Sequence, residues 1–329
     1  MEVTKVRKNN LIFVFGMLLC AISILAQTNY VQKTVPVKQA EKAANTSVIG
    51  QYLSFSGLGM LEMKAMFRNL PAEDRAAVMR FHIAFQLVKR PGLTADQKTL
   101  LFDGLSMITA DSYSDTDTAK QAVAEAKAVS LAPRIQALFQ GRERFEIFGN
   151  LGPTKDDVAI LQKYEDLTPL NDLQRKAVFR KVNAAEKRDL WRVHTALYLA
   201  RHFDLTASQK NFITDWLDFL TLEVFELSPK DPQWEAKVGK SLSVLTDKVL
   251  QAFSKEEAGN LVARLGEPQK EGTTISTEGL PAPEMDDCGC HRGIGDQCWG
   301  GECWGNVCRY SDYGCGFGWL LTCNGTKCT

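Results

Sequence analysis

The sequence predicts an all-α body, a tandem-duplicated helical bundle, followed by a small disulfide-rich module at the C-terminus. Three observations predict this. A segment of the body recurs at a fixed offset. Both copies carry helix-start signals and helical apolar spacing, and eight of the nine cysteines crowd between Cys288 and Cys328. The chain of 329 residues is 45% hydrophobic, which is enough for one or two cores and a small appendage.

Residues 1–26 have the three parts of a secretory signal peptide. Three basic residues precede a sixteen-residue apolar stretch from Leu11 to Ala26, which ends in a small residue. This stretch is shorter than the roughly 20 residues that a helix needs to cross a bilayer. We therefore expect a secreted or periplasmic protein, with a membrane-anchored form as the alternative. Residues 27–50 are expected to form a polar N-terminal segment.

The body contains an internal repeat. Residues 67–105 align without a gap to residues 179–217, at an offset of 112, and 14 of the 39 positions are identical. Chance alone gives about one identity in sixteen positions for ordinary composition. A later stretch continues the match at an offset of 114. We therefore predict one helical repeat at 51–155 and a second at 156–266.

Each copy carries the signals of α-helices. Thr94 and Thr206 are each followed three residues later by Gln, the capping-box pattern of a helix start. Both copies end in Leu-Gly followed closely by proline, so Gly152 and Gly266 are expected as helix C-caps. Apolar residues recur at helical spacing in both copies: Val78, Phe81, Phe85 and Val88 in the first, and Leu190, Val193, Leu197 and Ala200 in the second.

Two histidines occupy equivalent positions in the repeat, His82 and His194. A paired metal or acid–base site is one interpretation. His82 lies on the apolar stripe itself, however, so we expect a buried histidine that is hydrogen-bonded within the core. The chain shows no HExxH motif, nucleophile elbow or phosphate loop. We therefore expect no enzyme activity, no cofactor and no metal, and an enzyme is kept only as the third alternative.

The chain carries 39 basic and 39 acidic residues, so its formal net charge of +0 does not favour a nucleic-acid partner. Residues 267–287 contain prolines, glycines and a Thr/Ser run but no aromatic residue. Such a composition cannot bury enough surface to fold, so we expect a flexible linker. An exposed linker is also a candidate site for a processing protease.

Residues 288–329 form the expected disulfide-rich module. Cys20 leaves with the signal peptide, so an even number of cysteines remains. These eight are the predicted disulfide residues: Cys288, Cys290, Cys298, Cys303, Cys308, Cys315, Cys323 and Cys328. Their spacing leaves all 105 connectivities open. A zinc site, with His291 as a further ligand, is the competing interpretation, and we favour disulfides because export is oxidising.

The module is also rich in large apolar side chains. We expect some of them to form an exposed contact surface for a receptor of the bacterial cell envelope or for a membrane surface. The alternative is that they cover the disulfides as a minimal core. The candidate target-contact residues are Trp299, Trp304, Phe317, Trp319 and Leu320.

The opening Cys288-Gly289-Cys290, the Trp-Gly repeats and Gly314-Cys315-Gly316 resemble the bacteriocin fulvocin C and the proteins related to it. In that family a signal peptide and a longer helical region precede a C-terminal cysteine-rich peptide. The resemblance covers about the last 42 residues. It implies a secreted bacteriocin-like precursor whose stapled C-terminal peptide is the antibacterial effector and whose body is a pro-region or carrier. The alternative is a non-toxic binding module displayed on a helical scaffold.

Overall fold

The computed structural model describes residues 47–114, 117–228, 231–266, 288–291, 303–304, 311–315 and 317–328. The expected signal peptide, the expected linker at 267–287 and all but the last four residues of the segment 27–50 lie outside these ranges. The described residues fall into two compact units. The first takes in residues up to 159 together with 196–204, and the second takes in 160–195 together with the residues from 205 onward.

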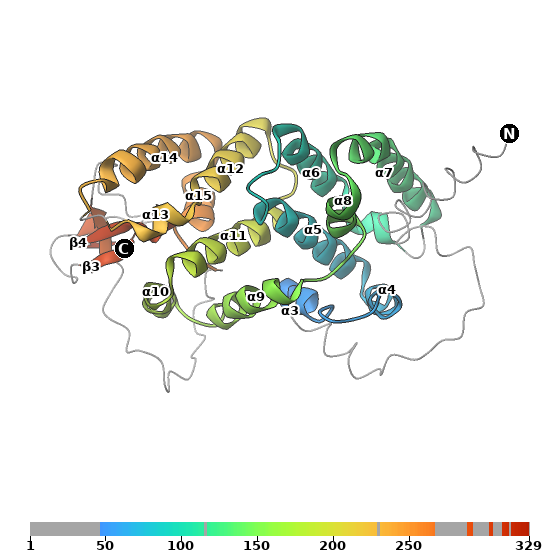
Figure 1. Ribbon diagram of the computed structural model, residues 1–329, viewed down its shortest axis with the longest axis horizontal. Helices are drawn as coiled ribbons and strands as arrows, with labels where there is room; N and C mark the ends of the chain where they lie inside the picture. The colour runs from blue at the N-terminus through green and yellow to red at the C-terminus, as the bar shows by residue number, and fades with distance from the viewer. Residues whose placement is uncertain are drawn as a thin grey trace. The chain divides into compact units, whose positions relative to one another are not determined.

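The body is all-α, as the sequence predicts (Figure 1). The first unit begins with two short helices and continues with the long helix that carries the apolar stripe. Its elements are α3 (Val48–Leu53), α4 (Met60–Asn69), α5 (Ala72–Val88), α6 (Ala95–Met107), the 3-10 turn η2 (Ala110–Tyr113), α7 (Thr118–Leu138) and α8 (Gly141–Phe148).

Helices α9 (Lys155–Leu167) and α11 (Ala184–Arg201) contribute residues to both units. The remaining helices belong to the second unit. They are α10 (Asp172–Lys181), α12 (Ala207–Phe219), α13 (Leu222–Glu226), the π-helical turn η3 (Glu235–Gly239), α14 (Lys240–Ala252) and α15 (Lys255–Val262).

The helix bounds repeat at the offsets seen in the sequence. Helices α4, α5 and α6 begin 112 residues before α10, α11 and α12, and α8 begins 114 residues before α15. The predicted capping boxes are confirmed: the Thr94 hydroxyl accepts the Gln97 amide at 3.2 Å, and the Thr206 hydroxyl accepts the Gln209 amide at 3.3 Å. The same local signals therefore start the same helices in both copies.

The expected C-caps are wrong in position. Helix α8 ends at Phe148 and α15 ends at Val262, so Gly152 and Gly266 each lie four residues beyond their helix. Both have positive φ, 136° and 103°. Glycine is favoured there because residues with a Cβ atom rarely adopt this backbone conformation. These glycines therefore shape the connection after the helix rather than its last turn.

The apolar stripe predicted for each copy is buried. In the first unit Tyr52 of α3 packs edge-on against Phe81 of α5, with ring centroids 5.3 Å apart. In the second unit Trp191 of α11 packs edge-on against Trp216 of α12, at 6.0 Å. Each unit therefore has aromatic packing of its own, on α5 in the first unit and on the Trp191 part of α11 in the second.

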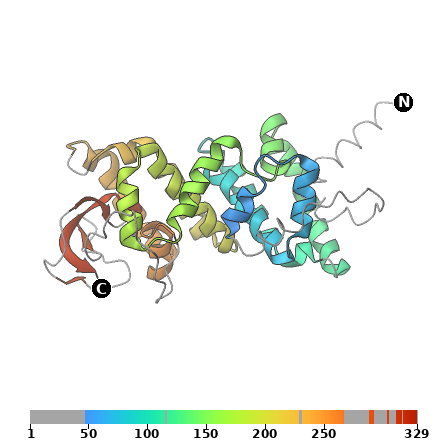
Figure 2. The same ribbon diagram turned by 90° about the horizontal axis from the view of Figure 1, so that it is seen from below.

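The C-terminal module contributes four short strands, which lie in red beside the helices of the second unit (Figure 2). They are β1 (Cys288–His291), β2 (Cys303–Trp304), β3 (Ser311–Cys315) and β4 (Leu321–Cys328). Strand β4 pairs antiparallel with each of the other three, and β3 lies against helix α10. The 3-10 turn η4 (Phe317–Trp319) joins β3 to β4 and is buried among the helices of the second unit.

Candidate functional site

The turn between β3 and β4 inserts large side chains into the second bundle. Phe317, Trp319 and Leu320 are 1%, 1% and 3% exposed. The Trp319 indole N–H donates to the backbone oxygen of Ala263, just beyond α15, at 2.8 Å. The indole is therefore both buried and hydrogen-bonded, which is the favourable state for a tryptophan inside a protein. We call Phe317–Leu320 the docking turn.

The docking turn meets aromatic side chains of three helices. Trp319 packs edge-on against Phe179 of α10 at 5.1 Å and against Trp191 of α11 at 5.8 Å. Phe317 packs edge-on against Trp216 of α12, with ring centroids 5.0 Å apart. Edge-to-face geometry is preferred by aromatic rings because the positive ring edge faces the negative face of its neighbour. The module thus completes the aromatic core of the second bundle.

The backbone of the docking turn is unusual. Gly318 has φ 61°, and a Cβ atom placed there would lie 3.2 Å from the ring of Trp216. Trp319 has φ 54°, and among the described residues it is the one non-glycine with positive φ. This conformation costs about 1–3 kcal/mol and persists only where the surroundings impose it. Burial of the indole is what imposes it here.

These positions correct part of the expected contact surface. We expected Phe317, Trp319 and Leu320 to face a target, and the structure buries all three in the second bundle. The reason is that aromatic rings of the bundle, Phe179 and Trp216 among them, pack against Trp319 and Phe317. Trp299 lies outside the described residues, and Trp304 belongs to β2, which is described by its backbone. The roles of those two tryptophans stay predictions.

The cysteines of the module are placed only in part. Six of the eight lie in the described strands, and Cys298 and Cys308 lie outside the described residues. The disulfides and the absence of zinc therefore stay predictions. Within the described part of the chain, no group of three or more His, Cys, Asp or Glu side chains is placed to hold a metal ion.

The two repeated histidines form equivalent buried pairs with tyrosines. In the first unit the Tyr52 hydroxyl lies 2.9 Å from His82 Nδ1, and His82 Nε2 lies 2.9 Å from the Ile147 oxygen. A backbone oxygen only accepts, so Nε2 carries the proton and Nδ1 accepts from the tyrosine. The prediction of a buried, hydrogen-bonded core histidine is confirmed for His82, which is 2% exposed.

The second unit repeats this arrangement. The Tyr164 hydroxyl lies 2.8 Å from His194 Nδ1, and His194 Nε2 lies 2.7 Å from the Asn260 oxygen. The Gly266 amide also donates to His194 Nδ1, at 3.2 Å. Both ring nitrogens of each histidine are therefore engaged within the fold. Each pair ties the helices of its bundle together, and this is a structural role.

Burial keeps the His82 ring neutral. It lowers the His82 pKa to about 4, although the hydrogen bond to the Ile147 oxygen acts in the opposite direction. The positive charges of Lys89 and Arg90 lower the pKa further, and Asp157 raises it. A ring that stays neutral near pH 7 and has both nitrogens hydrogen-bonded within the fold is poorly suited to acid–base chemistry.

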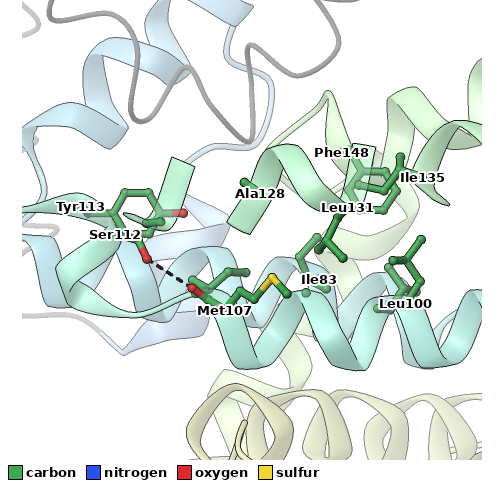
Figure 3. A pocket seen from close by; sticks show the side chains of 13 residues that line it. Ile83, Leu100, Met107, Ser112, Tyr113, Ala128, Leu131, Ile135 and Phe148 are labelled. Carbon is green, nitrogen blue, oxygen red and sulfur yellow. Dashed lines mark hydrogen bonds between the residues drawn. The ribbon is translucent and has the colours of Figure 1, made fainter. Parts of the chain in front are cut away.

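A small apolar pocket lies in the first unit (Figure 3). Leu100, Ile135 and Phe148 lie at one end, and Ser112 and Tyr113 at the other. Its volume is about 40 Å³. A water needs roughly 10–15 Å³ by this measure, and a cavity of about 150 Å³ takes a benzene ring. The pocket therefore has room for a few waters, and not for an organic ligand unless side chains move.

Comparison of the two copies explains why the first has a pocket. Gly104 lines it, and a Cβ atom placed there would meet nothing within 4 Å. The equivalent residue 112 positions later is Trp216, which is fully buried. Its indole N–H donates to the Thr195 hydroxyl at 3.0 Å, where the first copy has Ile83. The second copy thus fills with an indole the space that the first leaves open, and Phe317 then packs on that indole.

Two signals were present in the sequence and were missed. Tyr52 and Tyr164 are separated by the same offset of 112, but they lie before the segments in which the repeat is strong. The Gly104-to-Trp216 difference lies within those segments. It gives the second copy an indole, on which Phe317 packs, where the first copy has a glycine.

No known protein family, curated protein or solved structure matches the chain. None of the helices in the part of the chain that the structure describes has the length and the apolar character that crossing a membrane requires.

Proposed function

We propose that the chain is a secreted bacteriocin-like precursor of the fulvocin C-related kind, in which the second bundle holds the C-terminal effector module through the docking turn. The observation that carries this proposal is the burial of Trp319 between Phe179 and Trp191. A pro-region or carrier holds its effector until release, and the second bundle buries Phe317, Trp319 and Leu320 of the module.

The proposal has a specific consequence for release. Burying a large apolar side chain contributes roughly 1.5–3 kcal/mol, and the docking turn buries three. A protease cut within 267–287 removes the covalent connection but leaves these contacts intact. The cut module should therefore stay bound to the body until the docking turn dissociates. Release then requires two events, cleavage and undocking.

The proposal is tested with three samples: the intact exported chain, the chain cut within 267–287, and an oxidised peptide of residues 287–329. The free peptide should inhibit the growth of related bacteria, and the intact chain should inhibit weakly or not at all. On gel filtration the cut chain should elute as one complex. A well-folded peptide without effect on a broad panel of strains would refute the effector role.

The alternative is a non-toxic binding module that stays on its helical scaffold. The same docking turn favours it, because removing Trp319 from the second bundle would leave a hole in that core. Exported material distinguishes the two functions. A free C-terminal fragment in the culture medium supports the precursor, and an intact chain with a docked module supports the scaffold.

A further inference from the structure

Strand β4 sets cysteines opposite cysteines in two places. In its pairing with β1, the Cα atom of Cys290 has the Cα atom of Cys323 as its direct partner. In its pairing with β2, Cys303 has Cys328 as its direct partner. Both pairings are antiparallel. The backbone register alone therefore brings four of the eight cysteines together as two pairs.

Direct partners in antiparallel strands have the spacing that a disulfide needs. Their Cα atoms lie about 4.5 or 5.5 Å apart, depending on whether the pair is hydrogen-bonded. Disulfides join residues whose Cα atoms lie about 4.4–6.8 Å apart. A bond between direct partners therefore requires no movement of the backbone.

The other strand cysteines do not have this relationship. Cys288 has Lys327 as its direct partner, and Cys315 has Leu321. A register irregularity lies between Cys288 and Cys290, so these two neighbours are not interchangeable in the pairing with β4. The register thus selects Cys290 over Cys288 as the partner of Cys323.

We propose that Cys290 is bonded to Cys323 and Cys303 to Cys328. Four cysteines then remain, and four allow only three connectivities instead of the 105 that eight allow. Each bond forms when two thiols lose two protons and two electrons. A disulfide oxidant, such as oxidised glutathione, accepts the two electrons and the two protons and is reduced to two thiols. The two bonds attach β1 and β2 to β4, the strand that directly follows the docking turn.

Mass spectrometry of the unreduced full-length protein tests the second bond directly. Trypsin cuts after Lys327 and leaves Cys328-Thr329 as a dipeptide, which stays attached to the peptide that carries its partner. We expect it on residues 293–309. Chymotrypsin then cuts after Trp299 and Trp304, which separates Cys303 from Cys298 and Cys308. Attachment of the dipeptide to any cysteine other than Cys303 would overturn that bond.

Paired substitutions test the first bond, because Cys288 and Cys290 lie too close for proteases to separate. Replacing both members of a true pair, Cys290→Ser with Cys323→Ser, should leave no free thiol. The matched control, Cys288→Ser with Cys323→Ser, should leave two. The opposite result would assign the bond to Cys288 and overturn the proposal. A fully reduced or zinc-loaded wild-type protein would overturn both bonds, and neither result depends on the inhibition assay.

Discussion

The indole of Trp319 stands edge-on to the ring of Phe179, with the centroids 5.1 Å apart and the planes at 89°. Phe179 belongs to α10 of the second bundle, and Trp319 belongs to the docking turn of the module. The contact couples the two parts, because each ring forms part of the surface that buries the other. The sequence predicts a flexible linker at 267–287 between the module and the body. The structure nevertheless buries Phe317, Trp319 and Leu320 of the module in the second bundle.

Replacing Trp319 with alanine should lower the free energy of unfolding of the second bundle by about 3–5 kcal/mol, the usual effect of removing a buried tryptophan. Urea titration followed by helical circular dichroism measures the change. Val244→Ala on α14 is the control, because Val244 is 54% exposed and its truncation should change stability by less than about 0.5 kcal/mol. Equal midpoints for the Trp319 variant and the wild type would show that the turn is not docked.

A double-mutant cycle isolates the ring contact itself. Phe179→Ala and Trp319→Ala together should destabilise by less than the sum of the single variants. We expect a coupling energy of about 0.5–1.5 kcal/mol, the usual value for an edge-to-face pair. Strict additivity would mean that the two rings act independently.

Gly318→Ala should weaken docking. The alanine would have to adopt the φ of 61° found at Gly318, and its Cβ would lie 3.2 Å from the Trp216 ring. Gly57→Ala is the matched control, because Gly57 has φ 73° but a Cβ there meets nothing within 4 Å. Both variants carry a conformational penalty of about 1–2 kcal/mol, but Gly57 lies in the first unit, so only Gly318→Ala should act on docking. After a cut in the linker, the module should separate from the body faster in Gly318→Ala than in Gly57→Ala on gel filtration.

Gly104→Ala should stabilise the first bundle by about 1 kcal/mol. Alanine is favoured over glycine inside a helix, and the new methyl group enters open space in the pocket. Gly239→Ala provides the contrast, since its Cβ would lie 2.8 Å from a Glu235 carboxylate oxygen and 2.9 Å from the Trp234 ring. Thermal unfolding should shift upward for the first variant and downward for the second. A downward shift for Gly104→Ala would show that the pocket is already filled.

Acid should destabilise the first bundle through His82. The unfolded ring takes up a proton near its ordinary pKa of 6.5, and the buried ring does so only near 4. Between these values the unfolded state binds more protons than the folded state. The contribution of the neutral His82 ring to the free energy of unfolding is therefore fully present above pH 6.5 and is lost as the pH decreases toward 4. The loss approaches about 3 kcal/mol.

The pH dependence is measured by urea titration at several pH values between 4 and 7, approximately spanning the window set by the free and buried pKa values. A His82→Gln variant should be less stable at pH 7 but should show a flatter profile. In the wild type, the ring protons of His82 should hold their NMR shift through the range where a free histidine titrates. Titration of that signal near 6.5 would contradict the buried, neutral ring.

The helices could be predicted from sequence because their signals are local. A threonine cap and a glutamine three residues later fix where α6 and α12 begin, whatever surrounds them. The burial of His82 followed in the same way from its place on the apolar stripe. Its partner Tyr52 lies on another helix, and only the repeat offset points to it.

The docking turn could not be predicted in this way. Phe317 and Trp319 are only two residues apart in sequence, but the rings that bury them come from three separate helices. When a small module is considered by itself, its large apolar side chains are expected to be exposed. Whether they are buried depends on the shape of a cavity in the body, and composition and periodicity do not report that shape.

The place of Trp319 in the chain also orders the events of biosynthesis. It follows Phe179 by 140 residues, so its ring leaves the ribosome long after the helices that it joins. The first bundle can close as soon as residue 204 is available, because its residues all precede that point. The second bundle lacks the Trp319 indole among its aromatic rings until translation has passed residue 319. Any chain that stops short of Trp319 therefore carries an unfinished core, a defect that cellular proteases can recognise.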